Sequence, residues 1–301
     1  MIETKTVKVG NISCGSNKLF LISGPCVIEK ESVMLRTAEK LKMISDRWGI
    51  PLIFKSSFLK DNRSSLQYYR GPGIDKGLKI LQRIKEEFNL PLISDIHEPS
   101  HAGLVAGVLD VIQIPAYLCM QTSLILAAAN TGKPINLKHG QFLAPANMIK
   151  PVQKCVEAGN EQIIVTERGY TFGYNDLIVD PRSFYHLRQT GFPLVFDITH
   201  SIRKYGIPSS NPQGGSREYL PTIARAGVAA GVDGLFIETH PNPESALCDA
   251  SSQLPIGNLE KLIEPLIEIH ALEVRYRNRV LDEVVEREDN KMPLVPEMKG
   301  V

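Results

Sequence analysis

The stretch PLVFDITH, Pro193 to His200, begins as an unbroken apolar run and ends in an acid and a histidine. A run that is apolar at successive positions is typical of a strand buried on both faces of a parallel sheet. Further runs of this kind recur about every 30 residues, the spacing of strand–helix units. They are LFLISGP (from Leu19), PLIFKSSF (from Pro51), PLISDIHE (from Pro91), DVIQIPA (from Asp110), PINLKHG (from Pro134), QIIVTERG (from Gln162) and GLFIETH (from Gly234).

The segments between these runs have the spacing of amphipathic helices, with apolar residues recurring at intervals of three and four. The clearest are residues 31–49, 77–89 and 217–232. Eight strand–helix units predict an α/β fold of the (β/α)8 TIM-barrel class. The alternative is a doubly wound open sheet, but the chain lacks the GxGxxG turn that often opens such a sheet.

The remaining segments extend one barrel domain that we expect to span residues 1–301. Residues 1–19 are predicted to form an N-terminal β-hairpin that closes the barrel floor, with TKTVKVG (from Thr4) pairing with SNKLFLI (from Ser16). The stretch after Pro255 predicts a long terminal helix. The tail from about residue 287 to residue 301 is polar and contains proline, so we expect it to be loose.

The composition excludes several classes of protein. The 34 Lys and Arg residues balance 33 Asp and Glu residues, so the net charge of +1 gives no case for nucleic acid or membrane as the main partner. No apolar run approaches the roughly 18 to 20 residues of a membrane span, and the N-terminus lacks the apolar core of a signal peptide. Five scattered cysteines without a CxxC pair argue against a disulfide framework. We therefore expect a cytoplasmic protein.

The predicted strands end in polar or ionisable residues. In a (β/α)8 barrel the catalytic groups follow the carboxyl ends of the strands, so these residues should meet at one mouth. The cations among them would repel one another unless an anion neutralised them, and Lys and Arg suit phosphate and carboxylate. We therefore predict a strongly anionic substrate, with two phosphates as one case, bound by Lys55, Lys60, Arg63, Lys138 and Arg168.

Cys26 follows the first predicted strand directly. Because the first strand of a closed barrel neighbours the eighth, Cys26 should meet His200, Glu238 and Asp249 from the ends of the seventh and eighth units. A thiol, an imidazole and two carboxylates suit a divalent transition ion such as Zn, Fe, Mn or Co. From the residues alone, a catalytic Cys–His pair and an inert buried thiol remain alternatives.

From about Leu19 to Leu272 the chain resembles the family of 3-deoxy-D-manno-octulosonate 8-phosphate (KDO 8-phosphate) synthases. The resemblance implies a transferase of KDO and lipopolysaccharide biosynthesis that condenses phosphoenolpyruvate with D-arabinose 5-phosphate as a homotetramer. The motif KDNRSS contains Asn62, where the related synthase that uses erythrose 4-phosphate has proline, so Asn62 favours the five-carbon aldose. The segments that carry the resemblance are GPCVIE, FKSSFLKDNRSS, YRGPG, SDIHEP, IQIPAYLCMQTSL, NLKHGQFLAP, TERGYTFGYNDLIVD, FDITHS and FIETHPNPESALCDASSQLP.

The resemblance also implies roles for individual residues. Cysteine in the GPC motif marks the metal-dependent type, with Cys26, His200, Glu238 and Asp249 as ligands. Phosphoenolpyruvate would be held by Lys55, Ser57, Lys60, Lys138 and Arg168. The aldose would be held by Asn62, Arg63 and Ser64. Asp95 and Gln113 would shape the site. The residues expected to take part in the chemistry are Lys60, Asn62, Lys138, His200 and Asp249.

Three positions depart from the family pattern. Met120 stands where an arginine is usual, Asp61 replaces a small residue, and His139 replaces a common lysine. Two alternative functions therefore stay open: a 3-deoxy-D-arabino-heptulosonate 7-phosphate synthase using erythrose 4-phosphate, and a non-catalytic barrel that binds sugar phosphates. The loop over residues 202–218, rich in Gly, Pro and Ser, is a candidate lid.

Overall fold

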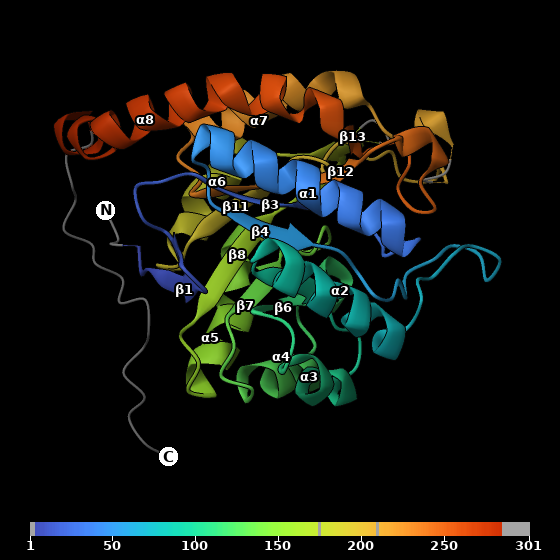
Figure 1. The fold of residues 1–301 in the computed structure, drawn as a ribbon. Coiled ribbons are helices and arrows are strands. Elements are labelled where there is room, and N and C mark those ends of the chain that lie inside the picture. The colour runs from blue at the N-terminus through green and yellow to red at the C-terminus, as the bar shows by residue number, and fades with distance from the viewer. Residues whose placement is uncertain (1–3, 174–175, 209–210, 285–301) are drawn as a thin grey trace, which may run out of the picture.

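A closed barrel of parallel strands lies at the centre of the computed structural model, which describes residues 4–173, 176–208 and 211–284 (Figure 1). Neighbouring strands follow chain order, and β11 pairs with both β8 and β12 to close the ring. All eight predicted strands and the (β/α)8 class are confirmed. The strands are β3 (Phe20–Gly24), β4 (Leu52–Lys55), β5 (Leu92–Asp95), β6 (Val111–Ile114), β7 (Ile135–Lys138), β8 (Ile163–Glu167), β11 (Leu194–Asp197) and β12 (Gly234–His240).

Helices surround the barrel (Figure 1). They are α1 (Glu31–Trp48), α2 (Ile74–Phe88), α3 (Pro99–Val105), α4 (Thr122–Ala129), α5 (Ile149–Glu157), α6 (Pro181–Arg188), α7 (Leu220–Ala229) and α8 (Leu259–Val284). The long helix predicted after Pro255 is therefore confirmed as α8. Three short strands lie outside the barrel ring: β9 (Thr171–Gly173) pairs with β10 (Asp176–Ile178), and β13 (Leu254–Pro255) pairs in parallel with the end of β12.

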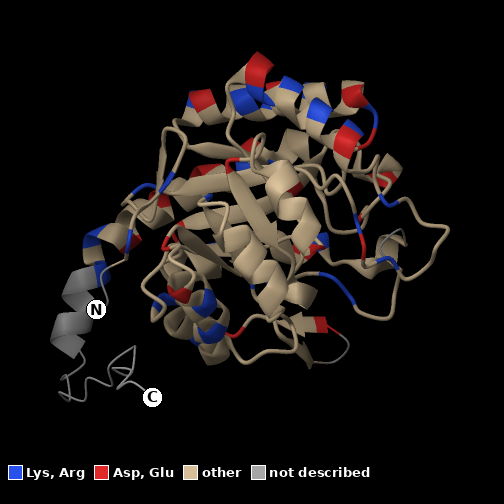
Figure 2. Cartoon of the chain, turned by 90° about the horizontal axis from the view of Figure 1, so that it is seen from below, with Lys and Arg blue, Asp and Glu red and all other residues tan. Residues whose placement is uncertain are grey.

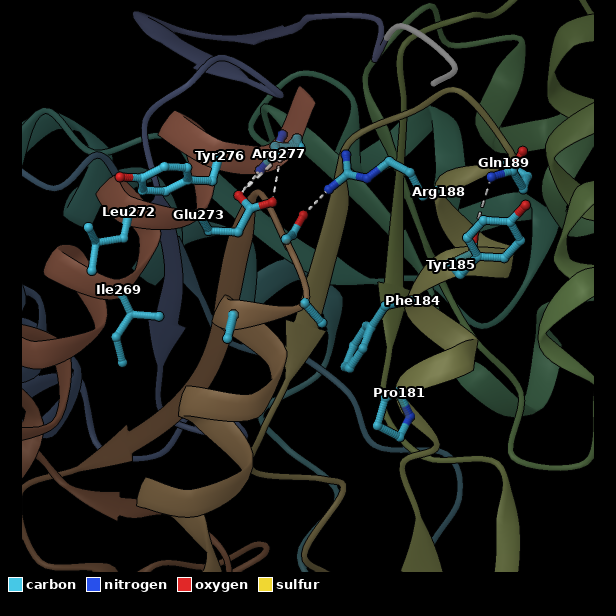
Figure 3. Close-up of a pocket in the computed structure, with 13 residues that line it drawn as sticks. Pro181, Phe184, Tyr185, Arg188, Gln189, Ile269, Leu272, Glu273, Tyr276 and Arg277 are labelled. Carbon is cyan, nitrogen blue, oxygen red and sulfur yellow. Dashed lines mark hydrogen bonds and ion pairs between the residues drawn. The ribbon is translucent and has the colours of Figure 1, made fainter. Parts of the chain in front are cut away.

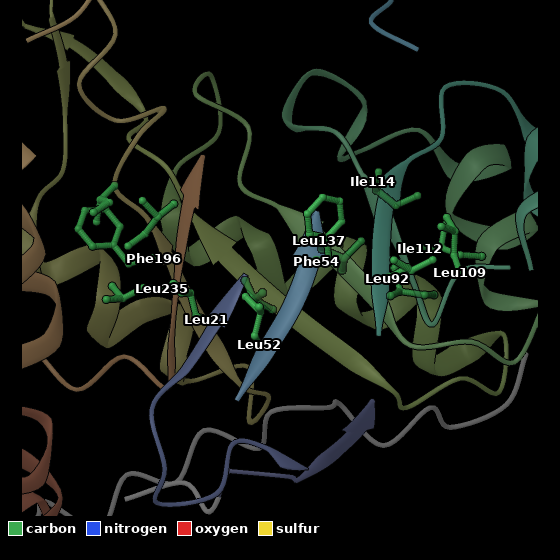
Figure 4. Close-up of a cluster of buried hydrophobic side chains, with 14 of the residues drawn as sticks. Leu21, Leu52, Phe54, Leu92, Leu109, Ile112, Ile114, Leu137, Phe196 and Leu235 are labelled. Carbon is green, nitrogen blue, oxygen red and sulfur yellow. The ribbon is translucent and has the colours of Figure 1, made fainter. Parts of the chain in front are cut away.

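Successive side chains of seven barrel strands enter two different hydrophobic clusters; in β7 the inward position is the polar Asn136. In β3, Phe20 and Ile22 point into the barrel interior, where they meet Phe236 of β12. Leu21, between them, belongs to the cluster between the barrel and the helices, which Figure 4 shows with Phe54. The unbroken apolar runs of the sequence therefore arise because both faces of each strand are buried.

An N-terminal hairpin of β1 (Val7–Val9) and β2 (Ile12–Cys14) packs its buried side chains against the barrel interior. The prediction of a hairpin is confirmed, but the predicted second strand from Ser16 to Ile22 is wrong. Phe20 and Ile22 fill the barrel interior as part of β3, so they are not available for a hairpin. The chain turns earlier, at Gly10, whose φ of 56° suits a tight turn.

The outer helices carry charges of both signs. Lys and Arg alternate with Asp and Glu along the helices in Figure 2, and the pairs include Lys42 with Asp46 and Arg83 with Glu31. This mixture agrees with the balanced composition. Within the described ranges, no helix combines the length and the apolar character needed to cross a bilayer. The predicted loose tail, 287–301, lies outside the described residues.

Candidate active site and metal centre

A cavity of about 330 Å³ opens at the carboxyl ends of the barrel strands, a volume in the usual range for a small-molecule site. A smaller and deeper cavity adjoins it, and the two share Lys60, Asn62, Tyr117, Arg168 and His200. The deeper one is also lined by Lys55, Asp95, Gln113 and Lys138, whereas the outer one is lined by Arg63, Ser64, Arg203, Lys204, Tyr205 and Asp249 among others. Most of the predicted substrate residues therefore surround one continuous space.

Asp197, at the end of β11, organises the centre of this space. Its fully buried carboxylate pairs with the Lys138 ammonium and accepts a hydrogen bond from His200 Nδ1 at 2.6 Å. It also accepts from the backbone N–H groups of Thr199 and His200, at 3.1 and 2.9 Å. These cationic neighbours outweigh burial and hold the pKa of Asp197 far below its usual range. The sequence placed Asp197 at a strand end but gave it no role in the site.

The predicted metal ligands meet in two overlapping groups that share Asp249. Within each group the ligand atoms lie within 4.8 Å of one another. One group joins His200, Glu238 and Asp249, and His200 Nε2 lies 3.7 Å from Glu238 Oε1 and 3.6 Å from Asp249 Oδ2. Because Nδ1 of His200 lies against Asp197, Nε2 is the ring nitrogen that faces the two carboxylates, and in the neutral ring it would offer its lone pair to a metal ion.

Glu238, near the end of β12, has one free ligand atom. Its Oε1 pairs with the buried Lys55 ammonium at 2.6 Å, but its buried Oε2 has no hydrogen-bond partner among the described residues. Burial disfavours the charged carboxylate, yet His200, Lys55 and Lys60 outweigh that cost and lower the pKa of Glu238. A buried ionised oxygen without a partner is costly, and a bound cation would satisfy it.

Cys26 belongs to the second group, with Cys248 and Asp249. Its sulfur lies 2.9 Å from the sulfur of Cys248 and 3.3 Å from Asp249 Oδ2. Burial, followed by these neighbours, raises the pKa of the Cys26 thiol well above its usual value. Only a bound cation would favour the thiolate in these surroundings. Cys248 was not predicted as a site residue, although it directly precedes Asp249.

A ladder of buried polar side chains joins four neighbouring strands beside the deeper cavity. Asp95 of β5 accepts from the Gln113 amide of β6, and Gln113 Oε1 accepts from Asn136 of β7 at 2.8 Å. Asn136 in turn accepts from the Thr166 hydroxyl of β8 at 2.6 Å. The Ser57 hydroxyl donates to Asp95 at 2.9 Å and is not among the residues that line either cavity. Asp95 and Gln113 thus fix the cavity wall, and Asp95 lies 3.5 Å from the Lys60 ammonium.

The Arg168 backbone is held by a buried pair that includes one of the departures from the family pattern. Glu167 Oε1 accepts from the backbone N–H groups of Arg168 and Gly169, at 2.8 and 2.6 Å. Its Oε2 lies 2.9 Å from His139 Nδ1, while His139 Nε2 lies 2.7 Å from the Leu143 carbonyl. Both ring nitrogens therefore face oxygen acceptors.

The other two departures lie away from the ligand atoms described above. Asp61 is exposed and pairs with Arg70, so its charge is compensated outside the cavity. The backbone carbonyl of Met120 accepts a hydrogen bond from Lys154 at 2.8 Å, and the Met120 side chain packs against the hydrophobic core.

The candidate lid forms part of the outer cavity wall. Arg203, at its start, pairs with Asp249 at 2.7 Å. The Lys204 backbone donates to Gly214 at 3.0 Å, and an isolated bridge joins Lys204 to Asp176. Tyr205 lies 3.4 Å from both the Arg168 guanidinium and the Tyr117 hydroxyl. No role in the site was predicted from the sequence for Arg203, Tyr205 or Tyr117.

A larger groove of about 560 Å³ lies between α6 and α8 (Figure 3). Tyr185, Leu272 and Tyr276 give it an apolar lining, and each of its charged residues is held in an ion pair. Arg188 pairs with the buried Asp233 at 2.6 Å, and Arg277 pairs with Glu273 at 2.5 Å. It offers none of the donor sets found at the strand ends, so the mouth of the barrel is the better candidate for an active site.

The chain is similar to known proteins over most of its length. The model of the DAHP synthetase I family matches residues 2–273. A relative from Trichlorobacter lovleyi, named 2-dehydro-3-deoxyphosphooctonate aldolase, is 49% identical over 270 residues, or 89% of this chain and 99% of that protein. Relatives of the same name from Acidithiobacillus ferrooxidans and Fusobacterium nucleatum are 53% and 49% identical, over 82% and 89% of this chain and 88% and 96% of their own lengths. The chain therefore belongs to the DAHP synthetase I family.

Proposed function

We propose that this chain condenses phosphoenolpyruvate with D-arabinose 5-phosphate and water to give 3-deoxy-D-manno-octulosonate 8-phosphate and inorganic phosphate. Relatives that match most of the chain are named 2-dehydro-3-deoxyphosphooctonate aldolase, which supports this product. The observation that carries the proposal is the meeting of Lys60, Arg63, Lys138 and Arg168 around cavities that also contain His200. These cations suit two anionic substrates held side by side.

The deeper cavity is the proposed phosphoenolpyruvate subsite. Lys60, Lys138 and Arg168 line it and supply the charge for one phosphate and one carboxylate. Burial lowers the pKa of Lys138 although Asp197 opposes this effect, so its ammonium can give up a proton more readily than an exposed lysine. Lys55 acts here by holding Glu238, and Ser57 acts by holding Asp95.

The outer cavity is the proposed aldose subsite. Asn62, Arg63 and Ser64 lie on its wall and would bind the hydroxyls and the phosphate of arabinose 5-phosphate. Burial disfavours the Arg63 cation, but Cys248, Asp249 and Cys26 outweigh that cost and raise its pKa. Arg63 therefore stays charged at every physiological pH, as phosphate binding requires.

The cofactor in this proposal is one divalent transition ion, such as Zn, Fe, Mn or Co, held by Cys26, His200, Glu238 and Asp249. The orphaned Glu238 oxygen and the mixed sulfur, nitrogen and oxygen donors support this assignment. When bound, the ion supplies Lewis acidity for the aldehyde oxygen or for the water molecule. Asp197 keeps His200 oriented toward the two carboxylates.

The reaction forms two bonds and breaks one. The methylene carbon of phosphoenolpyruvate bonds to the aldehyde carbon, and the aldehyde oxygen takes up a proton. Water then bonds to the carbon that bears the phosphate and gives up one proton, which balances the proton taken up by the aldehyde oxygen. The C–O bond to phosphate breaks, the new hydroxyl gives its proton to the departing phosphate, and a ketone is left. Lys60 and Lys138 offset the repulsion between the substrates, while Asn62, His200 and Asp249 position the aldose and the water.

The enzyme is proposed to work in the cytoplasm as a homotetramer, by analogy with the family that the sequence resembles. This assembly is tested by light scattering coupled to size-exclusion chromatography. A mass of about four times 33.4 kDa is expected, and a monomeric mass at assay concentration would overturn it.

The function is tested by measuring phosphate release from phosphoenolpyruvate with arabinose 5-phosphate or erythrose 4-phosphate. We expect turnover with the five-carbon aldose, loss of turnover after chelation, and recovery after a divalent ion is restored. Preference for erythrose 4-phosphate would identify the heptulosonate synthase instead. Tight binding of phosphoenolpyruvate without turnover under any ion would identify a binding protein.

A further inference from the structure

We infer that Cys248 supplies a second sulfur ligand to the metal centre, so that the ion is bound by two thiolates in addition to His200, Glu238 and Asp249. This inference rests on the metal-dependent form of the proposed function. Its starting point is the group formed by Cys26, Cys248 and Asp249, whose ligand atoms lie within 4.8 Å of one another. The same Asp249 belongs to the group with His200 and Glu238, so the two groups describe one centre.

The backbone at Asp249 turns two consecutive side chains toward this centre. Asp249 has a φ of 48°, and it is one of only two non-glycine residues with positive φ among the described residues. This left-handed conformation is uncommon outside glycine and persists where surrounding contacts impose it. Cys248 and Asp249 thereby both approach Cys26, although they are adjacent in the sequence.

Gln253 holds the two cysteine backbones together. Its Oε1 accepts a hydrogen bond from the Cys26 backbone N–H at 3.1 Å, and its Nε2 donates to the Cys248 carbonyl at 2.8 Å. Gln253 is fully buried, so this amide is committed to the two contacts. A single side chain therefore sets the spacing between the first barrel strand and the loop after the last.

Three cationic side chains lie near the two thiols. Cys26 is fully buried and Cys248 is 3% exposed, yet Lys60, Arg63 and Arg203 all interact with Cys248 or Cys26. A cysteine in an apolar core has no such neighbours, and Cys155 in α5 is an example. Cations beside a thiol are typical of functional cysteines, whereas structural buried cysteines lack them.

The distance between the sulfur atoms is compatible with two ligands to one ion. At 2.9 Å the thiols are not bonded, since a disulfide requires about 2.05 Å. Two sulfur ligands at about 2.3 Å from one ion lie roughly 3.3 to 4.0 Å apart when the angle between them at the ion is about 90 to 120°. To bind one ion together, the two sulfur atoms would have to move apart by about 1 Å or less, which rotation of the side chains can supply.

A second thiolate changes which ions the centre prefers. Thiolate ligands select zinc and ferrous iron, whereas carboxylate and water suit manganese and magnesium. The paired thiols therefore predict tighter binding of Zn²⁺ than of Mn²⁺ by this chain. Truncating Cys248 should narrow the difference, because one of the two soft ligands is lost.

The test is a titration of metal-free protein with Co²⁺ while the thiolate-to-cobalt absorption in the near ultraviolet is recorded. The absorption per bound cobalt should fall to about half in Cys248→Ser and in Cys26→Ser, and vanish in the double variant. Cys155→Ala, another buried cysteine, is the matched control and should keep the full absorption. The affinity for Zn²⁺ should fall at least roughly tenfold in Cys248→Ser, because losing even a hydrogen-bond partner of a metal ligand typically costs that much.

X-ray absorption of the wild-type zinc protein is the second measurement, and it does not depend on a variant that folds. Two sulfur neighbours at about 2.3 Å are expected. One sulfur neighbour, or full absorption in Cys248→Ser, would overturn the inference while leaving the synthase and its Cys26 ligand intact. Product formation by protein that binds no Co²⁺ would overturn this inference and the metal assignment but leave the synthase.

Discussion

Replacing Asp197 by asparagine should both destabilise the protein and abolish turnover. Asp197 is fully buried and is the carboxylate that faces the Lys138 ammonium, whose side chain is 6% exposed. Asparagine keeps the size and some hydrogen bonds but removes the charge. A buried cation is then left without its counterion, and His200 loses the acceptor that orients its ring.

The magnitude follows from the burial of the pair. Removing one partner of a buried ion pair costs about 3 to 5 kcal/mol. At about 2.1 cal/mol/K per residue, 301 residues give an unfolding entropy of about 0.6 kcal/mol/K. The melting temperature should therefore fall by about 5 to 8 °C. Turnover should fall by at least about 100-fold, since a group that orients a reacting centre is lost.

Calorimetry and the phosphate-release assay measure the two effects. Asp46→Asn is the matched control, because Asp46 forms an exposed pair with Lys42 and should change the melting temperature by under about 1 °C. Adding Lys138→Met to Asp197→Asn should restore most of the stability but no activity, since the orphaned charge is gone. If the melting temperature of Asp197→Asn lay within about 2 °C of wild type, close to the small change expected of the Asp46→Asn control, the stabilising role given to the buried pair of Asp197 and Lys138 would be refuted.

Three further predictions concern other parts of the chain. Gly24→Ala should abolish soluble expression, because the added Cβ would lie 2.0 Å from a backbone oxygen of β4. Gly103→Ala on α3, where the added Cβ would meet no atom within 4 Å, should instead raise the free energy of unfolding by roughly 0.5 to 1 kcal/mol in thermal unfolding. His139→Gln should raise KM for phosphoenolpyruvate roughly tenfold through loss of a charged hydrogen bond, whereas His139→Lys should raise it less in steady-state assays. Hydrogen bonds from Arg182 lower the pKa of the Asp180 carboxyl, which caps helix α6, to about 2. The ionised Asp180 carboxylate stabilises the folded state fully above about pH 4, and this stabilisation is lost as the pH falls to about 2. The melting temperatures of wild type and Asp180→Asn should therefore converge over that pH interval.

The fold was predictable because its signal is repeated. Each barrel strand buries both faces, so each leaves an apolar run that ends where the polar mouth begins, as in PLVFDITH from Pro193 to His200. The hairpin was harder to predict, since the segment around Phe20 has the same composition whether it pairs with Val7 or fills the barrel. Only the closed barrel decides between the two, and closure is a property of the whole chain.

The site was partly predictable for a related reason. Residues at strand ends, such as Lys138 and Glu238, are fixed by the register of the barrel. Residues in the loops depend on backbone conformation, which composition does not reveal. Cys248 enters the centre because Asp249 adopts positive φ, and asparagine or glycine would have been the usual signal for that conformation.

The ladder from Asp95 through Gln113 and Asn136 to Thr166 has a consequence for how this protein can evolve. Each member presents to its neighbour the donor or acceptor that the neighbour lacks, so the direction of every hydrogen bond depends on the one before. Changing one residue leaves a buried polar atom without a partner on the next strand. Replacements along the ladder should therefore become fixed together in any lineage, and these four positions should drift as a unit while the loops around them diversify one residue at a time.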